Sequence, residues 1–448
     1  MSKITGTMDF GAIEVTILIA TGLTCYVLVR SFRDCCSTPL KGPSSTFHNF
    51  FFGVMPYLRS APDAGAIYEE WASEYGEVFS VPGFLGSRSI IFTDPKTIAH
   101  FAAGETYGYV STPHSKRFSE KLMGRGIFWA EGDSHKRQHR ALNPAFSNAA
   151  IKDLTYIFFD SAYKVKAAWD VILEAGPSEG TLIEVQLWMN HISLDTIGLA
   201  GFAHNFGALS GKTSQIAAAF NNISSKAGFL DNAVFLSSFI IPILGYIPTG
   251  RRLMLNQLTR TMSNLGDRFL ATSRDVSSDK SVIGLLVKSA SAEKFSHEEV
   301  KAQINTLLIA GYETTAISLT WALLELLRNP AMQIKLREEL VQSGGDPMWE
   351  ELTNQGSFLG AVTCEVLRLH PPKPELRRMA AEDDILPLSA PIETADGKLV
   401  DTVFMRKGTV VTLPVVCINR SEAFWGSNAK EFNPARWLGD EKHQAQEL

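Results

Sequence analysis

Residues 296–328 read SHEEVKAQINTLLIAGYETTAISLTWALLELLR and form the longest helix-periodic stretch of the chain. Ser296 can cap the start, because Glu299 three residues later completes a capping box, and Asn329-Pro330 ends the pattern. At about 1.5 Å per residue such a helix is roughly 50 Å long, enough to cross a whole domain. We therefore expect one long helix to organise the fold.

The centre of this helix carries the hexapeptide AGYETT at residues 310–315, which is unusual for a helix that crosses a core. Gly311 and the β-branched Thr314 are poor helix formers, and a threonine hydroxyl can bond back to a carbonyl. Two interpretations stay open. One is a hydrated kink or a satisfied core carboxylate at Glu313. The other is a distorted turn that leaves room for a small ligand and delivers a proton to it.

The rest of the chain is predicted to be mainly α-helical with a small β-sheet region. Helices are expected over residues 152–173, 184–202, 215–229, 252–276, 331–342 and 357–369. A hairpin-like strand pair is expected at residues 77–81 and 88–92, and a second β-rich patch at residues 386–399.

Length, charge and cysteine content narrow the class of protein. The 448 residues, 45% of them hydrophobic, indicate one large globular domain with appendages. Forty-two Lys and Arg against 47 Asp and Glu give a net charge of −5, so we expect no nucleic-acid partner. The five cysteines contain no CxxC pair, which excludes a disulfide framework and a clustered zinc site and favours a reducing compartment.

The amino terminus contains a candidate transmembrane anchor at residues 10–29, about the length that crosses a bilayer, with one charge. Arg30, Arg33 and Lys41 follow it and only Lys3 precedes it, which by the positive-inside rule leaves the large domain cytoplasmic. No small-residue cleavage site follows, so we favour an uncleaved single-pass anchor. The expected organisation is a tail at residues 1–9, the anchor, a basic Pro/Gly linker at residues 30–46 and the main domain at residues 47–448.

A second apolar run, FLSSFIIPILGYI at residues 235–247, is too short to span a membrane. It is either a buried core segment or a loop that dips into the membrane surface beside the anchor.

Further motifs accompany the long helix. Glu365 and Arg368 lie three residues apart and so on one helix face, and Arg436 belongs to the later sequence FNPARW. Upstream, residues 132–137 read GDSHKR and residues 143–147 read NPAFS. Together with AGYETT, these motifs resemble in order and spacing the cytochrome P-450 family of haem-thiolate monooxygenases, of the membrane-anchored microsomal type. The resemblance covers roughly residues 47–440.

The resemblance implies the cytochrome P-450 fold with haem as cofactor. Glu365, Arg368 and Arg436 would then form a buried structural triad on the proximal side of the haem.

Residues that would hold the haem follow from the same resemblance. Arg378 matches the family's propionate-binding arginine, and His135 and His139 stand where helix-borne residues reach the propionates. The family usually has arginine at the second position, so His139 is a weaker, pH-dependent donor. A zinc pair of the two histidines is the alternative, but neither a third ligand nor a glutamate base accompanies them.

Glu313 and Thr314 match the family's acid-alcohol pair, which implies a catalytic proton relay during oxygen activation. The resemblance also explains why two small residues, Ala310 and Gly311, stand next to this pair: the haem face and the substrate need that space. The implied reaction inserts one oxygen atom of O2 into an apolar small molecule. Its electrons come from NADPH through a flavoprotein reductase at the endoplasmic reticulum membrane.

The family's cysteine loop, which carries the axial thiolate, is expected after FNPARW, but LGDEKHQAQEL after Trp437 contains no cysteine. Cys364 and Cys417 match ordinary interior positions of the family, so no metal ligand is assigned. Two expectations remain. One is a monooxygenase whose cysteine loop lies beyond Leu448; the other is a truncated, inactive, membrane-anchored relic or binding module of the same fold.

Deleting residues 1–38 should move the protein from the membrane fraction to the soluble fraction, because the single span is the main anchor. Fractionation of both forms by ultracentrifugation, followed by immunoblotting, measures the shift. Full retention of the shortened protein on membranes would mean that another surface, such as residues 235–247, holds it there.

Overall fold

The computed structural model describes residues 37–44, 46, 50, 52–104, 106–211, 247–272, 295–354 and 356–439, with residues 21 and 284 as isolated positions. The predicted anchor and the apolar run at residues 235–247 lie outside this part of the chain, except for residues 21 and 247. So does the helix expected at residues 215–229. The chain forms two compact units, Met1–Thr112 with Pro374–Phe424 and Pro113–Lys373 with Trp425–Leu448. We call them the sheet unit and the helical unit.

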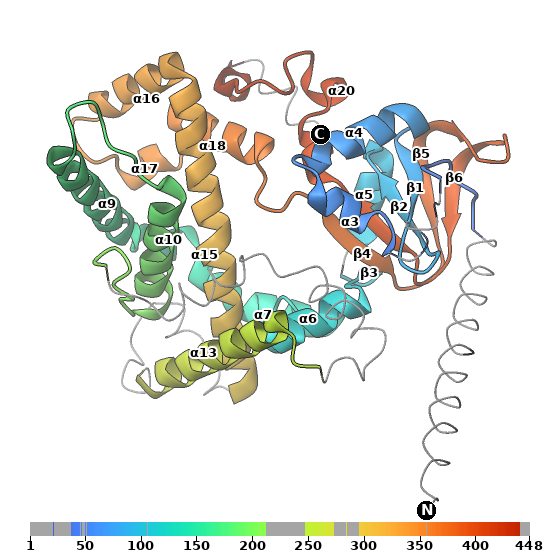
Figure 1. The fold of residues 1–448 in the computed structure, drawn as a ribbon, viewed down its shortest axis with the longest axis horizontal. Helices are drawn as coiled ribbons and strands as arrows, with labels where there is room; N and C mark the ends of the chain where they lie inside the picture. The colour runs from blue at the N-terminus through green and yellow to red at the C-terminus, as the bar shows by residue number, and fades with distance from the viewer. Residues whose placement is uncertain are drawn as a thin grey trace, which may run out of the picture. The chain divides into compact units, whose positions relative to one another are not determined.

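The sheet unit contains a five-stranded sheet of order β1-β2-β7-β4-β3 and a two-stranded sheet of β5 and β6 (Figure 1). The strands are β1 (Val78–Pro82), β2 (Arg88–Phe92), β3 (Tyr109–Val110), β4 (Leu376–Ala380), β5 (Asp384–Glu393), β6 (Leu399–Met405) and β7 (Val410–Leu413). The predicted hairpin is confirmed, since β1 and β2 pair antiparallel, whereas β2 and β7 pair parallel. The helices are α3 (Met55–Ser60), α4 (Ala64–Tyr75), α5 (Pro95–Gly104) and α19 (Val415–Asn419), and the chain leaves this unit within α20 (Glu422–Trp425).

Strand β1 is buried along its whole length because both of its faces are covered. Alternate side chains of a strand point to opposite faces. Accordingly Val78 packs with Phe92 and Phe101 in one apolar cluster, while Phe79 packs against Trp71 of α4 in another. The alternation anchors the larger sheet between two apolar layers.

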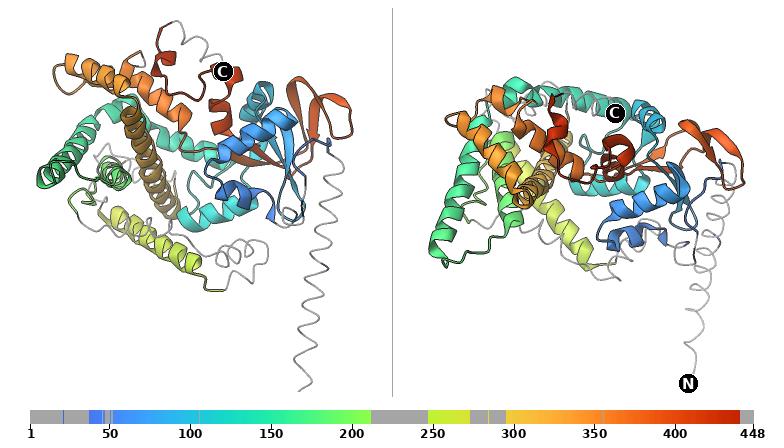
Figure 2. Two further views of the ribbon diagram at one scale, coloured as in Figure 1. Left: turned by 45° about the horizontal axis from the view of Figure 1, so that its top comes forward. Right: turned by 90° about the horizontal axis from the view of Figure 1, so that it is seen from above.

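The helical unit is built around α15 (His297–Arg328), with α10 (Val185–Phe202) alongside it and α13 (Gly250–Thr272) near its amino-terminal half (Figures 1 and 2). The remaining helices are α6 (Pro113–Met123), α7 (Gly132–Leu142), η1 (Asn143–Phe146), α8 (Asn148–Lys152), α9 (Thr155–Ala175), α16 (Pro330–Gln342), α17 (Trp349–Leu352), α18 (Phe358–Leu369) and η4 (Pro434–Trp437). The fold is therefore mainly α-helical with small sheets, as predicted.

The amino-terminal cap of α15 is the one that the sequence predicts. The Ser296 hydroxyl accepts from the Glu299 backbone N–H, and the Glu299 carboxylate accepts from the Ser296 N–H. In the described residues, α15 is also the helix long and apolar enough for a membrane crossing. Contacts with α10, α13, α16 and α18 place it inside the helical unit.

The distorted turn expected at residues 310–315 is wrong, because α15 is one unbroken α-helix from His297 to Arg328. Hydroxyl groups instead bond to the carbonyls of this segment. The Thr314 hydroxyl donates to the Ala310 carbonyl at 2.5 Å, and the Ser193 hydroxyl of α10 reaches the carbonyls of Gly311 and Tyr312 at 2.8 and 2.7 Å. The polar centre is therefore accommodated without opening the helix.

Candidate functional site

Glu365 of α18 is fully buried and lies between two arginines of the helical unit. Arg368, one turn further along α18, donates to both carboxylate oxygens at 2.8 Å. Arg436 of η4 donates its Nε–H to Glu365 Oε1 at 3.0 Å. The structure thus brings together all three residues of the expected triad, with Arg368 in the bidentate geometry that a guanidinium group allows and Arg436 making one bond.

Two further donors to Glu365 complete the cluster. The indole N–H of Trp437 donates to Oε2 at 2.9 Å, and the backbone N–H of Asn433 donates to Oε1 at 2.9 Å. Trp437 belongs to the FNPARW motif, but the sequence analysis did not assign it a part in the triad. The one available signal was that an indole N–H can only donate a hydrogen bond and therefore needs an acceptor when it is buried. The carboxylate therefore accepts five hydrogen bonds.

The arginines also hold the chain that precedes η4. Arg368 donates to the carbonyls of Ala429 and Glu431, and Arg436 donates to those of Trp425 and Asn428. The Trp425 ring lies 4.9 Å from the Arg368 guanidinium, within the range of a cation-π contact. One ionic cluster thereby fixes the path of residues 425–437 against α18.

Burial alone would raise the pKa of the Glu365 carboxyl, but the hydrogen bonds and charge of Arg368, the Asn433 N–H and the Trp437 indole outweigh it. The pKa of Glu365 consequently lies below its usual value, which is about 4.3 in model peptides. The ionised Glu365 therefore stabilises the folded protein fully at any pH above the pKa of an unfolded glutamate. This contribution is lost as the pH falls through the lower pKa that Glu365 has in the folded protein.

The predicted catalytic pair lies on α15. Glu313 and Thr314 are adjacent and exposed within the helical unit, as is Ala310 one turn earlier. At Gly311, a Cβ would lie 2.9 Å from the Ile197 side chain of α10. Its small size is required for the packing of α10 on α15.

The predicted propionate-binding residues are divided between the units. His135 is half-buried and His139 exposed on α7, with ring centroids 5.6 Å apart. Arg378 is half-buried on β4 of the sheet unit, where it lies opposite Val411 of β7. Among the described residues no group of three histidines, cysteines or acidic residues could hold a metal, so the zinc alternative gains no third ligand there.

The chemistry of the described residues can be compared with what a haem needs, which is donors for its propionates and an axial ligand for its iron. The imidazoles of α7 and the guanidinium of Arg378 are N–H donors suited to carboxylates. Neither described cysteine suits an axial ligand, since Cys417 packs in an apolar cluster with Trp71 and Phe79, and Cys364 lies within α18. The described residues therefore include N–H donors of the kind that carboxylates accept, but no cysteine suited to be the axial thiolate.

Comparisons with known proteins identify the class to which this fold and site belong. The model of the cytochrome P-450 family matches residues 43–447. The cytochrome P-450 monooxygenase claP of Ampulloclitocybe clavipes is 51% identical over 96% of this chain and 82% of its own length. For claQ of the same fungus the identity is 53%, over 90% of this chain and 77% of the relative. Cytochrome P-450 monooxygenase 205 of Postia placenta is 32% identical over 90% of this chain and 77% of its own.

The chain belongs to the cytochrome P-450 family. Its function is that of a haem-dependent monooxygenase, and membership of the family implies a redox partner and a small-molecule substrate.

Glu365→Ala or Arg436→Ala should greatly lower the yield of folded, haem-loaded protein. Removing one partner of a buried ion cluster costs about 3–5 kcal/mol, against a total stability of about 5–15 kcal/mol. Haem content and thermal melting measure the loss. Arg368→Lys tests geometry apart from charge, because an ammonium group cannot make the forked bond, so it should also melt lower.

The control for these variants is Lys164→Ala, which removes an exposed ion pair with Asp160 on α9. Its effect should stay within about 0.5 kcal/mol. Triad variants that matched this control in melting and haem content would show that the cluster is not a structural requirement.

Proposed function

We propose that this monooxygenase inserts one oxygen atom of O2 into an apolar small molecule, with electrons that a flavoprotein reductase takes from NADPH. Glu313 and Thr314 are its proton-transfer residues. The single observation that carries the proposal is the exposure of this acid-alcohol pair at the middle of α15, the central helix of the helical unit.

The haem, when bound, supplies the redox chemistry that activates dioxygen. The residues that would hold it are Arg378, His135 and His139 at the propionates and Ala310 and Gly311 beside the ring. Ala310 supports this assignment, because its methyl side chain occupies little of the exposed α15 surface beside Thr314.

The proton path starts at Glu313. Its carboxylate is exposed and can take protons from water, while Thr314 is its neighbour on the helix. The Thr314 hydroxyl donates to the Ala310 carbonyl at 2.5 Å in this structure, so a rotation about χ1 would free its proton for the reacting oxygen. A hydroxyl both accepts and donates, which lets Thr314 pass a proton on and recover it from the Glu313 side.

The location in the cell belongs to the same proposal. A single span at residues 10–29 would hold the enzyme on the endoplasmic reticulum membrane, with the main domain in the cytoplasm. An apolar substrate dissolved in the bilayer would then be concentrated beside the enzyme.

Thr314→Ala should uncouple the haem-loaded enzyme: NADPH consumption continues, hydrogen peroxide rises and product falls at least tenfold. The physical reason is the loss of the hydroxyl that positions the transferred proton, a step typically worth 10²–10⁴-fold. Parallel assays of NADPH, peroxide and product, with the reductase added, measure the coupling.

Thr314→Ser keeps the hydroxyl and should retain most of the coupling. Thr315→Ala is the matched control, because Thr315 is the exposed neighbour that the proposal leaves without a role. Equal coupling in the Thr314→Ala and Thr315→Ala variants would remove Thr314 from the relay.

A further inference from the structure

The Ser193 hydroxyl of α10 reaches across to the backbone of α15. It donates to the Gly311 carbonyl at 2.8 Å and to the Tyr312 carbonyl at 2.7 Å, and Ser193 is only 3% exposed. A hydroxyl has one hydrogen, so Ser193 shares it between the two carbonyls. The two acceptors belong to the residues that directly precede Glu313 and Thr314. Ser193 therefore contacts α15 immediately beside the proposed proton-transfer pair.

This cross-helix bond differs from the bond that a helical hydroxyl commonly makes. Serine and threonine hydroxyls inside a helix can bond to the carbonyl four residues earlier in the same helix. Hydroxyls of α15 do so at 2.5 to 3.0 Å, namely those of Thr306, Thr314, Ser318 and Thr320. Carbonyls inside an α-helix also accept from the N–H four residues later, so Ser193 adds a second bond to them. Its hydroxyl thus fixes where the two helices meet.

Two apolar contacts flank the hydroxyl bonds. Ile197, one turn after Ser193 on the same face of α10, packs so closely that a Cβ on Gly311 would lie 2.9 Å from its side chain. Leu194 and Tyr312 are both buried and belong to one apolar cluster. The apolar contacts limit how closely the helices approach each other. The hydroxyl bonds are directional, so they limit the rotation of α15 about its axis.

The rotation of α15 decides where the relay residues point. Successive residues of an α-helix are turned by about 100° and rise by about 1.5 Å. Thr314 therefore lies only about 3 Å along the axis beyond Tyr312. A displacement of about 1 Å at a reacting group can cost on the order of 100-fold in rate. The direction of the Thr314 hydroxyl consequently depends on the contacts that α10 makes at residues 311 and 312.

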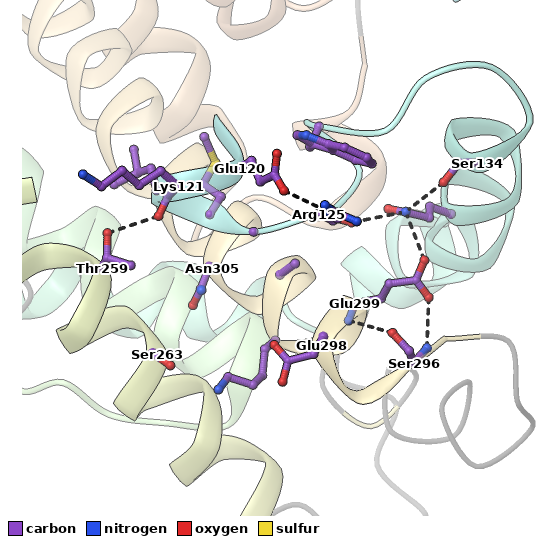
Figure 3. A pocket seen from close by; sticks show the side chains of 17 residues that line it. Glu120, Lys121, Arg125, Ser134, Thr259, Ser263, Ser296, Glu298, Glu299 and Asn305 are labelled. Atoms are coloured by element: carbon purple, nitrogen blue, oxygen red, sulfur yellow. Dashed lines mark hydrogen bonds and ion pairs between the residues drawn. The ribbon is translucent and has the colours of Figure 1, made fainter. Parts of the chain in front are cut away.

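The first turns of α15 are held by a different set of contacts. Gln303 accepts from the Ile127 N–H at 3.1 Å and donates to the Gln138 side chain of α7 at 2.6 Å. Both glutamines are almost fully buried, and buried amides are costly unless they are bonded. Figure 3 shows these turns from Ser296 to Asn305, beside the pocket of about 820 Å³ that they line.

Close packing of the segment after α6 reinforces this end of α15. Gly124 has a φ of +87°, and a Cβ there would lie 2.9 Å from the Ala302 Cβ. A Cβ on Gly126 would lie 2.8 Å from the Ala302 carbonyl oxygen and from Thr306 Oγ1. Glycine is therefore needed at both positions. These contacts fix α15 at residues 302–306, whereas α10 holds the part of the helix that carries the relay.

We propose that Ser193 is a positioning residue of the monooxygenase, whose hydroxyl bonds set the rotation of α15 and thereby aim the Thr314 hydroxyl. Ser193 acts through the α15 backbone and does not touch the reacting atoms. This role rests on the proposed relay of Glu313 and Thr314. Without the Ser193 hydroxyl, more O2 should take two electrons from NADPH and two protons and leave as hydrogen peroxide. Less O2 should then give one oxygen atom to the substrate and the other to water.

Ser193→Ala should lower the ratio of product to NADPH consumed at least threefold, with a matching rise in hydrogen peroxide. Its haem content should equal that of the wild type. Its melting temperature should fall by no more than about 4 °C, because one hydrogen bond contributes little to the stability of a domain of this size. Parallel assays of NADPH, peroxide and product on the haem-loaded enzyme with its reductase measure the coupling.

Ser161→Ala is the matched control. Ser161 of α9 is as buried as Ser193, but its hydroxyl has no hydrogen-bond partner among the described residues, so its loss should leave the coupling unchanged. Ser193→Thr keeps the hydroxyl and should retain most of the coupling. If the added methyl group prevents folding, Ser193→Cys serves instead. Its thiol is a weaker donor, so its coupling should lie between those of serine and alanine.

The double variant Ser193→Ala/Thr314→Ala should be coupled no worse than Thr314→Ala alone, because Ser193 acts through Thr314. An equal further loss in both backgrounds, unchanged coupling in Ser193→Ala, or the same loss in Ser161→Ala would each overturn the role of Ser193. Thr314→Ala alone tests the relay. If it uncouples the enzyme and Ser193→Ala does not, only the positioning role is wrong. If it does not uncouple the enzyme, the relay is wrong and the positioning role with it.

Discussion

The negative charge of Glu365 is held where its side chain has no contact with water, and the carboxyl-terminal part of the helical unit is arranged around that constraint. Removing an ion from water costs several kcal/mol, so a carboxylate stays charged in such a place only if donors replace its hydration shell. Five donors do so here, and three of them come from residues 433–437. Helix α18 and residues 433–437 are far apart in the chain, so they must come together during folding before Glu365 can be buried as an ion.

The sequence predicted several contacts within one helical turn, whereas most contacts between distant segments could not be predicted. The capping box of α15 and the pair of Glu365 and Arg368 could be predicted, because each depends on residues one helical turn apart. The family resemblance added Arg436. The parallel pairing of β2 with β7 and the Ser193 bonds to α15 joined residues that no spacing rule connects. Tertiary contacts also overruled the expectation of an opened turn.

Helix α15 has an exposed face and a covered face, which its sequence separates by half a turn of rotation. The face with Glu313 and Thr314 is exposed within its unit, whereas the face with Asn305 is covered by α13 and the segment after α6. An unbroken helix keeps the two faces in a constant orientation, which a hinge at Gly311 would not. Gly311 accordingly functions as a contact point for α10.

The glutamine pair of α7 and α15 has a consequence for protein engineering. Gln138 and Gln303 are neutral at every pH, so the hydrogen bond between them is itself insensitive to acidity and to added salt. Chimeras that exchange the stretch between α6 and α7 among relatives would need to bring a matching amide with them, and glycines at positions 124 and 126 as well. The stretch between α6 and α7 should therefore be exchanged together with Gln138 and Gln303.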